Sequence, residues 1–154
     1  MPLMLTSPAI PSGSEITAQY TCDGADISPP LSWSRAPEET RSLVLVVGDP
    51  DASSGTFRHW VVFDISPAAR GLDAGYSANR PAAGLHEAHN DFGKVGYGGP
   101  CPPPGHGTHH YHFRLLAISR PTLDLRAAAP ALDVLKAAQP YVIQQAEFVA
   151  TFHR

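Results

Sequence analysis

Hydrophobic residues mark four segments of the chain as β-strands. Residues 41–47 (RSLVLVV) are almost continuously apolar, which is typical of a strand buried on both faces. The other three segments are rich in β-branched and aromatic side chains: residues 59–65 (HWVVFDI), 111–119 (YHFRLLAIS) and 146–152 (AEFVATF). The pattern therefore predicts a mainly β protein.

Two shorter patterns complete this prediction. Residues 14–22 (SEITAQYTC) alternate, which favours a further strand with four side chains on one face: Ile16, Ala18, Tyr20 and Cys22. Residues 131–139 (ALDVLKAAQ) predict a short helix, because Pro130 can open it and Pro140 can end it. Several strands and one late helix indicate a β-sandwich with one or two short peripheral helices.

Side chains alternate between the two faces of a strand, so odd and even positions predict which residues share a face. The apolar odd series of the strand at 43–49 ends in Asp49, and the odd series at 109–117 begins with His109. The odd series of the strand between them consists of His59, Val61, Phe63 and Ile65. If the three strands meet at one rim, Asp49, His59 and His109 lie together over the end of the apolar core.

Length and charge narrow the classes of function. The 154 residues suffice for one domain with a substantial core, and we expect residues 1–154 to form it. The formal charge is −3 and only 16% of residues are charged, so no broad basic face for nucleic acid is expected. No segment approaches the roughly 18 apolar residues of a membrane helix, which argues against membrane insertion.

The N-terminal sequence and the cysteines bear on the cellular compartment. Residues 1–15 lack the basic and apolar parts of a secretory signal, which favours a cytoplasmic location. Cys22 and Cys101 are the only two cysteines. In a reducing compartment such residues are more often free thiols than a disulfide, so free thiols are expected, with a disulfide as the alternative.

Several motifs resemble the phosphatidylethanolamine-binding protein family. They are DPDA at 49–52, HWVVFDI at 59–65 and YGGPCPPPGHGTHHYHF at 97–113. Two more, YTCDGADISPPLSW at 20–33 and NDFG at 90–93, resemble its bacterial branch, the Raf-kinase-inhibitor-like proteins. The resemblance covers nearly the whole chain. It implies a Greek-key sandwich of two antiparallel sheets with a small rim pocket for phosphate, acetate or a phospholipid head group.

The resemblance also implies which residues bind the ligand. Carried over to this sequence, the set is Asp49, Asp51, His59, Gly99, Cys101, Pro102, His109 and Tyr111. Two positions depart from the family pattern, which usually has proline at Ser53 and arginine at His110. The missing arginine removes a fixed charge near the pocket and affects partner contacts more than the pocket itself. The family also includes inhibitors of kinases and of serine proteases, so inhibition of such an enzyme is an alternative function.

The glycine- and proline-rich segment before the third strand suits a preorganised binding loop. Glycine lets backbone approach a ligand and proline fixes φ, so N–H groups near Gly99 and Cys101 could face an anion. The hydroxyl of Tyr111 and the two imidazoles are further donors. Asp49 can stabilise a neighbouring imidazolium, so we predict tighter binding of phosphate-type ligands at about pH 5.5 than at about pH 8.

Three other interpretations stay open. Cys101 with a histidine and Asp49 has the residue types of a low-activity hydrolase, although prolines flank the cysteine and a binding protein without enzymatic activity is favoured. A histidine-rich tract could bind metal: His106, His109, His110 and His112. His110 and His112 have the opposite strand parity to His109, so neither a metal nor a cofactor is expected. Residues 66–108 could form a protein-contact surface or a homodimer interface.

Overall fold

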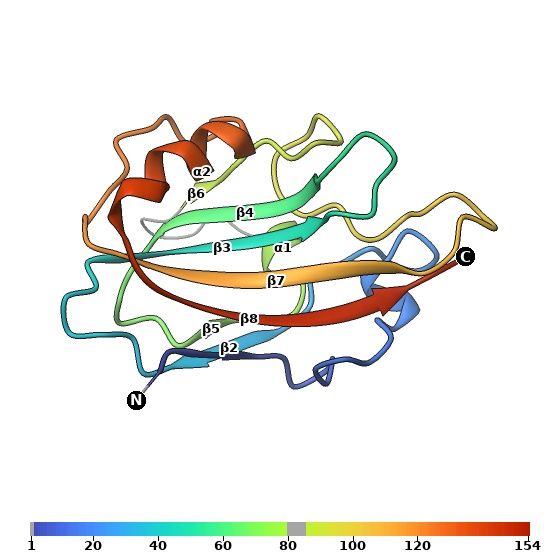
Figure 1. The fold of residues 1–154 in the computed structure, drawn as a ribbon, viewed down its shortest axis with the longest axis horizontal. Coiled ribbons are helices and arrows are strands. Elements are labelled where there is room, and N and C mark those ends of the chain that lie inside the picture. Colours follow the sequence, from blue (N-terminus) through green and yellow to red (C-terminus); the bar gives the residue numbers. More distant parts are fainter. Residues whose placement is uncertain (1, 80–85) are drawn as a thin grey trace.

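Eight strands form two antiparallel sheets in this computed structural model, which describes residues 2–79 and 86–154. The smaller sheet has the strand order β1 (Met4–Thr6), β2 (Leu31–Ser34) and β5 (Gly71–Leu72). The larger sheet has the order β6 (His86–Glu87), β4 (Phe57–Ile65), β3 (Ser42–Asp49), β7 (His109–Ile118) and β8 (Val142–Phe152). The two sheets form the layers of a sandwich (Figure 1).

Short helices lie at the edges of the sandwich. The longest, α2 (Ala131–Ala138), follows Pro130, and a 3-10 turn that contains Pro140 (η2, Gln139–Tyr141) ends it. This is the helix that the sequence predicts. Two others are α1 (Tyr76–Asn79) and the 3-10 helix η1 (Ala18–Tyr20). In Figure 1, α2 lies over the end of the larger sheet where β7 leaves it and β8 begins.

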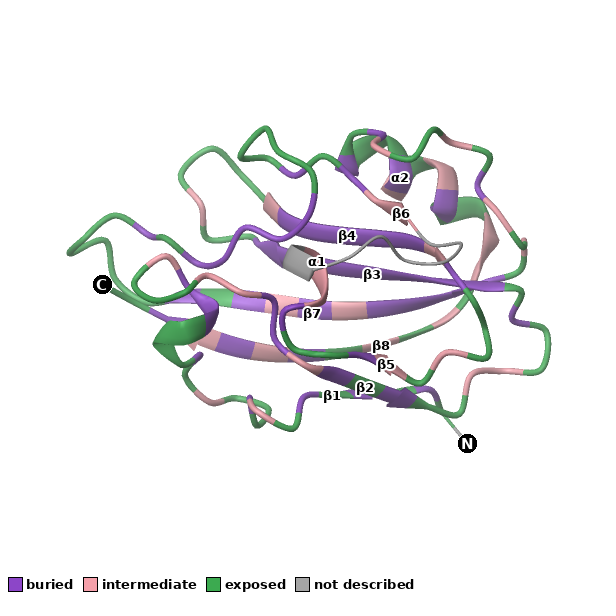
Figure 2. Cartoon of the chain, turned by 180° about the vertical axis from the view of Figure 1, so that it is seen from behind, coloured by how far each residue is buried: buried purple, intermediate pink, exposed green. Residues whose placement is uncertain are grey.

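The larger sheet separates two hydrophobic cores, so its central strand is buried on both faces. Side chains such as Leu45, Trp60 and Phe113 fill the space between the sheets. On the other face, Val46 and Phe63 pack with side chains of α2 such as Val134. Every residue of β3 is buried, as Figure 2 shows. The continuous apolar run at 41–47 is the sequence signature of this position.

The four predicted strands are confirmed, but the fifth one at 14–22 is wrong. Ala18–Tyr20 forms a 3-10 turn, in which Tyr20 N–H donates to Thr17 O and Thr21 N–H donates to Ala18 O. Strand-like pairing is confined to the start of the segment, where Glu15 forms an isolated parallel bridge with Thr151 of β8: Thr151 N–H donates to Ser14 O and Ile16 N–H donates to Thr151 O. Ile16 and Tyr20 are buried as expected, but Ala18 is exposed. The alternation therefore predicted the burial of Ile16 and Tyr20 correctly, but not that of Ala18, and it predicted the strand incorrectly.

Two irregularities in β4 change which of its side chains share a face. The register with β3 shifts once between Val47 and Gly48, and again between Leu43 and Leu45. Opposite each shift, β4 has one residue more than β3. At the first shift the extra residue is His59, and at the second it lies between Val62 and Ile65. Asp64, in that second stretch, has φ +57°. These are β-bulges, which redirect the side chains that follow them.

The bulges correct the face assignment made from parity. Val61 and Phe63 pack in the core under α2, and not with the odd side chains of β3 and β7. Trp60, Val62 and Ile65 point into the core between the sheets instead. His59 reaches the predicted rim because it is the bulged residue and not because the alternation is regular.

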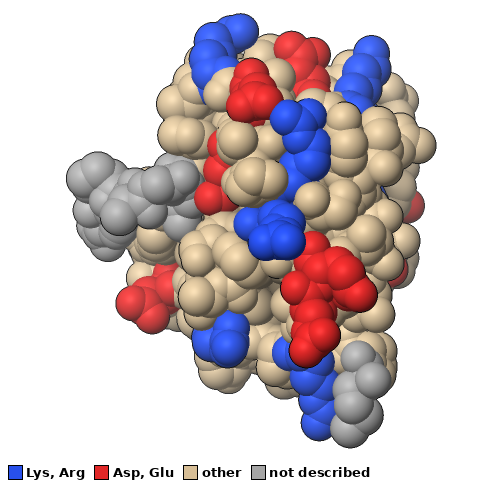
Figure 3. Space-filling model, turned by 90° about the vertical axis from the view of Figure 1, so that its left-hand side faces the viewer, with Lys and Arg blue, Asp and Glu red and all other residues tan. Residues whose placement is uncertain are grey.

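Charged side chains of both signs are interspersed on the face drawn in Figure 3, with no broad basic area on it. No helix in the described part of the chain has the length and apolar character needed to cross a membrane.

Candidate functional site

The ends of β3, β4 and β7 form one wall of a small cavity. Asp49 is the last residue of β3 and His109 the first of β7, and their side chains meet with 2.6 Å between Oδ2 and Nδ1. Asp49 is 3% exposed and His109 4% exposed. His59 and Tyr111, also buried, complete this group, which we call the strand wall. The structure thus brings together the three ionisable residues that the sequence pattern placed at one rim.

His59 is fixed by a backbone acceptor and by aromatic neighbours. Its Nδ1 is 2.7 Å from the carbonyl oxygen of Gly98, so Nδ1 carries the proton and donates it to that oxygen. The ring packs edge-on against Tyr111 and Phe92. Burial lowers the pKa of His59, and the hydrogen bond to Gly98 opposes this only in part. The neutral ring therefore presents the lone pair of Nε2 as an acceptor.

Tyr111 contributes a hydrogen-bond donor to the cavity. Burial raises the pKa of its hydroxyl far above the usual range, and the nearby charges of Asp49 and Asp51 act in the same direction. The phenol stays protonated at any physiological pH. Its ring lies between His59 and His109, 5.3 Å and 6.4 Å from their ring centres.

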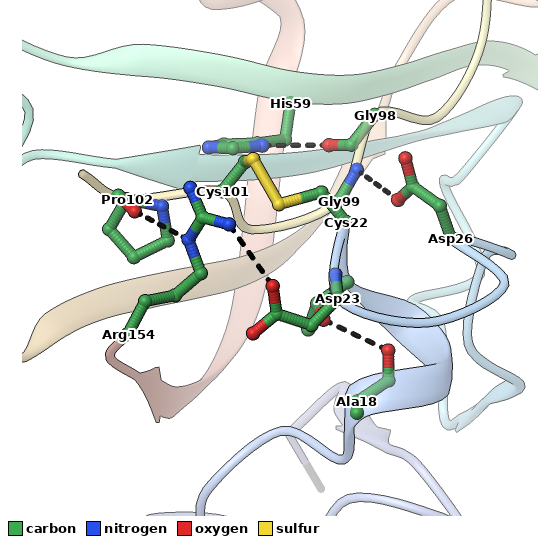
Figure 4. The surroundings of a disulfide bond; sticks show 11 residues. Ala18, Cys22, Asp23, Asp26, His59, Gly98, Gly99, Cys101, Pro102 and Arg154 are labelled. Carbon is green, nitrogen blue, oxygen red and sulfur yellow. Dashed lines mark hydrogen bonds and ion pairs between the residues drawn. A yellow bond between two sulfur atoms is a disulfide. The ribbon is translucent and has the colours of Figure 1, made fainter. Parts of the chain in front are cut away.

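A glycine- and proline-rich segment, residues 97–107, forms the opposite wall, and we call it the strap. Links from distant parts of the chain hold it, among them the disulfide and the hydrogen bonds of Asp26 and Arg154 that Figure 4 shows. The Cys22–Cys101 disulfide joins it to the segment after η1, and Gly99 N–H donates to Asp26 Oδ1 at 2.8 Å. Arg154 donates from Nε to Pro102 O at 2.8 Å, and its own main-chain oxygen accepts from Gly105 N–H at 3.0 Å.

The disulfide corrects the expectation of free thiols. Cys22 N–H donates to Pro100 O, which brings the two segments side by side although 79 positions separate the cysteines. Proximity in the fold and not spacing in the sequence determines this pairing. A bonded Cys101 has no thiolate, so the hydrolase interpretation loses its nucleophile in this structure.

Two predicted site residues have other contacts in the structure. The amide of Gly99, expected to face a ligand, already donates to Asp26, and a Cβ at this position would collide with the Tyr20 carbonyl oxygen. Gly99 therefore allows the strap to approach the segment after η1. Asp51 is exposed, and its carboxylate accepts from both the N–H and Nδ1 of His110. These hydrogen bonds lower the pKa of Asp51, and its own N–H donates to Asp49 Oδ1 at 2.8 Å.

The space between the two walls is a cavity of about 150 Å³. Six predicted site residues line it: Asp49, His59, Cys101, Pro102, His109 and Tyr111. Sequence reasoning did not assign the others to the pocket: Ala52, Ser53, Phe57, Phe92, Pro103 and His106. Of these, only His106 carried a signal, as the first histidine of the tract. Its Nδ1 lies 2.6 Å from His109 Nε2.

The histidine tract does not gather around one point. His110 faces Asp51, and His112 faces Glu147 on the outer side of the larger sheet. Within residues 2–79 and 86–154, no group of three or more His, Cys, Asp or Glu side chains is arranged to hold a metal ion.

A larger groove, of about 710 Å³, lies on the outer face of the larger sheet beside α2. Its basic side chains have partners: Arg58 pairs with Asp91, His112 with Glu147, and Arg114 with Gln145. The groove is wide and solvent-exposed, whereas the smaller cavity contains buried ionisable groups. We therefore place the candidate site at the smaller cavity.

Comparison with known proteins shows the family to which the chain belongs. A family model described as "Phosphatidylethanolamine-binding protein" matches residues 6–153. The chain belongs to this family. A UPF0098 protein of Aquifex aeolicus is 45% identical over 93% of this chain and 84% of its own length. The putative lipoprotein LppC of Mycobacterium tuberculosis is 40% identical over 98% of this chain and 72% of its own length.

Solved structures of family members have the same fold. The crystal structure of Escherichia coli YbcL superposes with a TM-score of 0.94 over 100% of this chain and 99% of that one, at 29% identity. A putative phosphatidylethanolamine-binding protein homologue from Chlamydia trachomatis, CT736, gives 0.87 over 99% and 98%, at 34% identity. The predicted family, its bacterial branch and the β-sandwich of two antiparallel sheets are confirmed.

Proposed function

We propose that this protein is a binding protein, not an enzyme, for small phosphate-type anions and phosphoryl head groups. The observation that supports this most directly is the buried Asp49–His109 pair at the wall of the cavity, next to His59 and the Tyr111 hydroxyl. The carboxylate of Asp49 lies 2.6 Å from His109 Nδ1, so it can balance the charge of the ring when the ring is protonated. The ring can then donate to an anion while Asp49 balances the charge.

The volume of the cavity limits what enters it. A space of about 150 Å³ corresponds to roughly five water molecules at about 30 Å³ each. Phosphate, acetate or the phosphoryl part of a head group fits, whereas a complete lipid does not. The aromatic rings of Phe57 and Phe92 stand at the opening, where they can contact the rest of a larger ligand.

Donors in the cavity are available for an anion. The Tyr111 hydroxyl makes no hydrogen bond to another group in the described part of the chain, and burial keeps it protonated. His59 becomes a second donor only when its Nε2 is protonated, because Nδ1 is committed to Gly98. The Tyr111 hydroxyl therefore favours anion binding at any physiological pH, and His59 adds to it at lower pH.

Titration calorimetry with glycerophosphoethanolamine tests the proposal, because its phosphodiester keeps one negative charge from pH 5.5 to pH 8. The protonated fraction of an imidazole with a reference pKa of about 6.5 falls about thirtyfold over this range. We expect affinity to fall in the same direction, by up to about thirtyfold. Tyr111→Phe should weaken binding at both pH values, whereas His112→Ala, on the outer face, should not. Affinity that is flat or rises with pH would contradict the proposal.

The disulfide also bears on where the protein works. Free thiols were expected from a cytoplasmic location, whereas disulfides persist in oxidising compartments. We propose that the domain works in such a compartment with the Cys22–Cys101 bond intact. The putative lipoprotein name of the Mycobacterium tuberculosis relative is compatible with this. Alkylation of the native protein in cells, before and after reductant, should label no cysteine before reduction. Two labelled cysteines before reduction would reject the proposal.

A further inference from the structure

His106 occupies the position from which a ligand would contact His109. Both ring nitrogens of His109 already have partners, since Nδ1 is 2.6 Å from Asp49 Oδ2 and Nε2 is 2.6 Å from His106 Nδ1. The two rings are 4.9 Å apart and tilted by 49°. His106 lines the same cavity as Asp49 and Tyr111. In the free protein, His109 therefore has no nitrogen left for an anion.

The contact between the two imidazoles holds a single proton. Asp49 accepts the proton on His109 Nδ1, so two arrangements remain for the facing nitrogens. Either a neutral His106 donates from Nδ1 to His109 Nε2, or a protonated His109 donates from Nε2 to His106. If both facing nitrogens carried protons, two donors would meet at 2.6 Å and the contact would break. The closed contact therefore tolerates at most one positive charge on the pair.

Other charged groups around the pair are engaged elsewhere. Asp51, beyond the end of β3, accepts from His110 of β7. His59 of β4 donates to Gly98 of the strap. At the C-terminal end of β8, Arg154 donates to Pro102 and to Asp23. The partner of His106 is therefore His109, with Asp49 behind it.

The backbone around His106 permits the ring to leave without disturbing the rest of the strap. Gly105 has φ +78° and Gly107 has φ +98°, a conformation that residues with a Cβ rarely adopt. A Cβ on either residue would meet no atom within 4 Å, so close packing does not require glycine there. On one side the strap is fixed by the Gly105 N–H bond to Arg154, and on the other β7 begins at His109.

We propose that His106 is a specificity-determining residue that occupies the anion site in the free protein and that a ligand must displace. The proposal rests on the proposed function. When an oxyanion enters, it replaces His106 Nδ1 as the acceptor for His109 Nε2–H. His109 ends with a proton on both nitrogens, and when His106 was the donor in the free protein the additional proton comes from the solvent. The ligand class is a phosphoryl or similar oxyanion, because a neutral acceptor gains too little from an imidazolium to displace the ring.

Proton counting by calorimetry tests this step. Sulfate is the first probe, since it does not titrate between pH 6 and pH 8, so any proton taken up on binding goes to the protein. Heats of binding are measured at pH 7.5 in two buffers with different ionisation enthalpies. We expect wild-type protein to take up a substantial fraction of one proton for each sulfate bound. Binding without proton uptake would overturn the arrangement in which a neutral His106 is the donor, and displacement of His106 would then have to appear in the His106→Ala affinity and in the ring signals.

His106→Ala removes the internal occupant. If the closed contact is present in about nine of ten molecules, its removal strengthens sulfate binding about tenfold. His112→Ala is the matched control, because it removes a histidine from the same strand as His109 but on the opposite face, and it should leave affinity unchanged. Equal affinities in wild type and His106→Ala would overturn the inference, and so would weaker binding by His106→Ala, which would make His106 a direct ligand contact.

Nitrogen NMR of the histidine rings gives an independent readout on the wild-type protein. Sulfate should move the ring signals of His106 to those of a solvent-exposed imidazole and give His109 the signals of an imidazolium. Inorganic phosphate and glycerophosphoethanolamine are then compared, since free phosphate and a lipid head group share the same chemistry. If neither wild type nor His106→Ala binds any of the three, the proposed function fails. If both bind and the His106 signals do not move, only the inference fails.

Discussion

The strand wall is held by sheet hydrogen bonds and a packed core, whereas the strap is held by a disulfide and by a few side-chain and main-chain hydrogen bonds to distant segments. Asp49 and His109 belong to strands β3 and β7, which pair along seven registered positions. Within the strap, residues 98–107 form no strand or helix, and the Cys22, Asp26 and Arg154 contacts fix its position.

This difference in how the two walls are held predicts how each responds to the loss of a contact. A change in the strand wall leaves a buried charge without a partner, so it should lower the stability of the whole domain. Loss of a link of the strap should move the strap away from an intact sheet, and loss of the disulfide should in addition lower stability, because it frees the unfolded chain. Binding depends on both walls, but folding cooperativity depends mainly on the first.

Removal of the disulfide should have the largest effect on stability. The Cys22–Cys101 bond closes a loop with a sequence separation of 79. Loop-closure entropy for that length corresponds to about 4.5 kcal/mol. We expect Cys22→Ser/Cys101→Ser to lose about 4.5 kcal/mol in urea unfolding, and to keep a native near-ultraviolet spectrum while anion affinity falls.

The reduced wild-type protein is the control for the serine substitutions, because it should show the same loss with its native sequence. A double variant as stable as wild type, or one that retains full anion affinity, would show that the side-chain links alone hold the strap. A variant without the native spectrum would show that the two walls do not fold independently.

Substitution of two aspartates should lower stability by less than loss of the disulfide does, and the two substitutions should differ sharply from each other. Asp49 is buried against His109, whereas the side chain of Asp51 is 41% exposed against His110. We expect Asp49→Asn to cost about 3 kcal/mol, because breaking a buried pair leaves a polar group with a poorer partner. Asp51→Asn should cost less than about 1 kcal/mol, as exposed ion pairs do. Equal losses in urea unfolding would contradict this distinction.

Regular strand pairing explains why much of the strand wall could be predicted from the sequence. Asp49 and His109 end and begin apolar series whose alternation holds along β3 and β7. His59 was placed correctly for an incomplete reason, since a bulge and not regular alternation brings it to the rim. The same bulges made the predicted face of Val61 and Phe63 wrong. No local pattern in 59–65 signals an extra residue, because a bulge is defined by the partner strand.

The strap could be predicted only in part, because tertiary contacts define its geometry. Its glycines and prolines indicate a stiff loop, and that much is visible in the sequence. The disulfide, the Asp26 bond to Gly99 and the Arg154 bond to Pro102 join positions 79, 73 and 52 residues apart. Pairings at such separations leave no periodic trace. The amide of Gly99 was therefore assigned to a ligand when it belongs to Asp26.

Substitution of His59, which belongs to the strand wall and donates to Gly98 of the strap, should have the smallest effect, visible only in the pH dependence of stability. Burial lowers its pKa in the folded protein, so between the unfolded value of about 6.5 and the lower folded value the unfolded chain binds more protons. Its contribution to stability is complete above about pH 6.5 and decreases as the pH falls below that value. We expect His59→Gln to lose less stability than wild type between pH 7.5 and pH 5.5 in urea unfolding.

The exposed His153 supplies the control for this measurement, and His153→Gln should keep the wild-type pH dependence. Glutamine at position 59 can still donate to Gly98 O, so the comparison isolates titration from the loss of that hydrogen bond. A pH dependence for His59→Gln equal to that of wild type would mean that the ring is hydrated through the cavity. In that case the lone pair of Nε2 faces water, and His59 would act as a cationic donor to anions at a higher pH than its burial suggests.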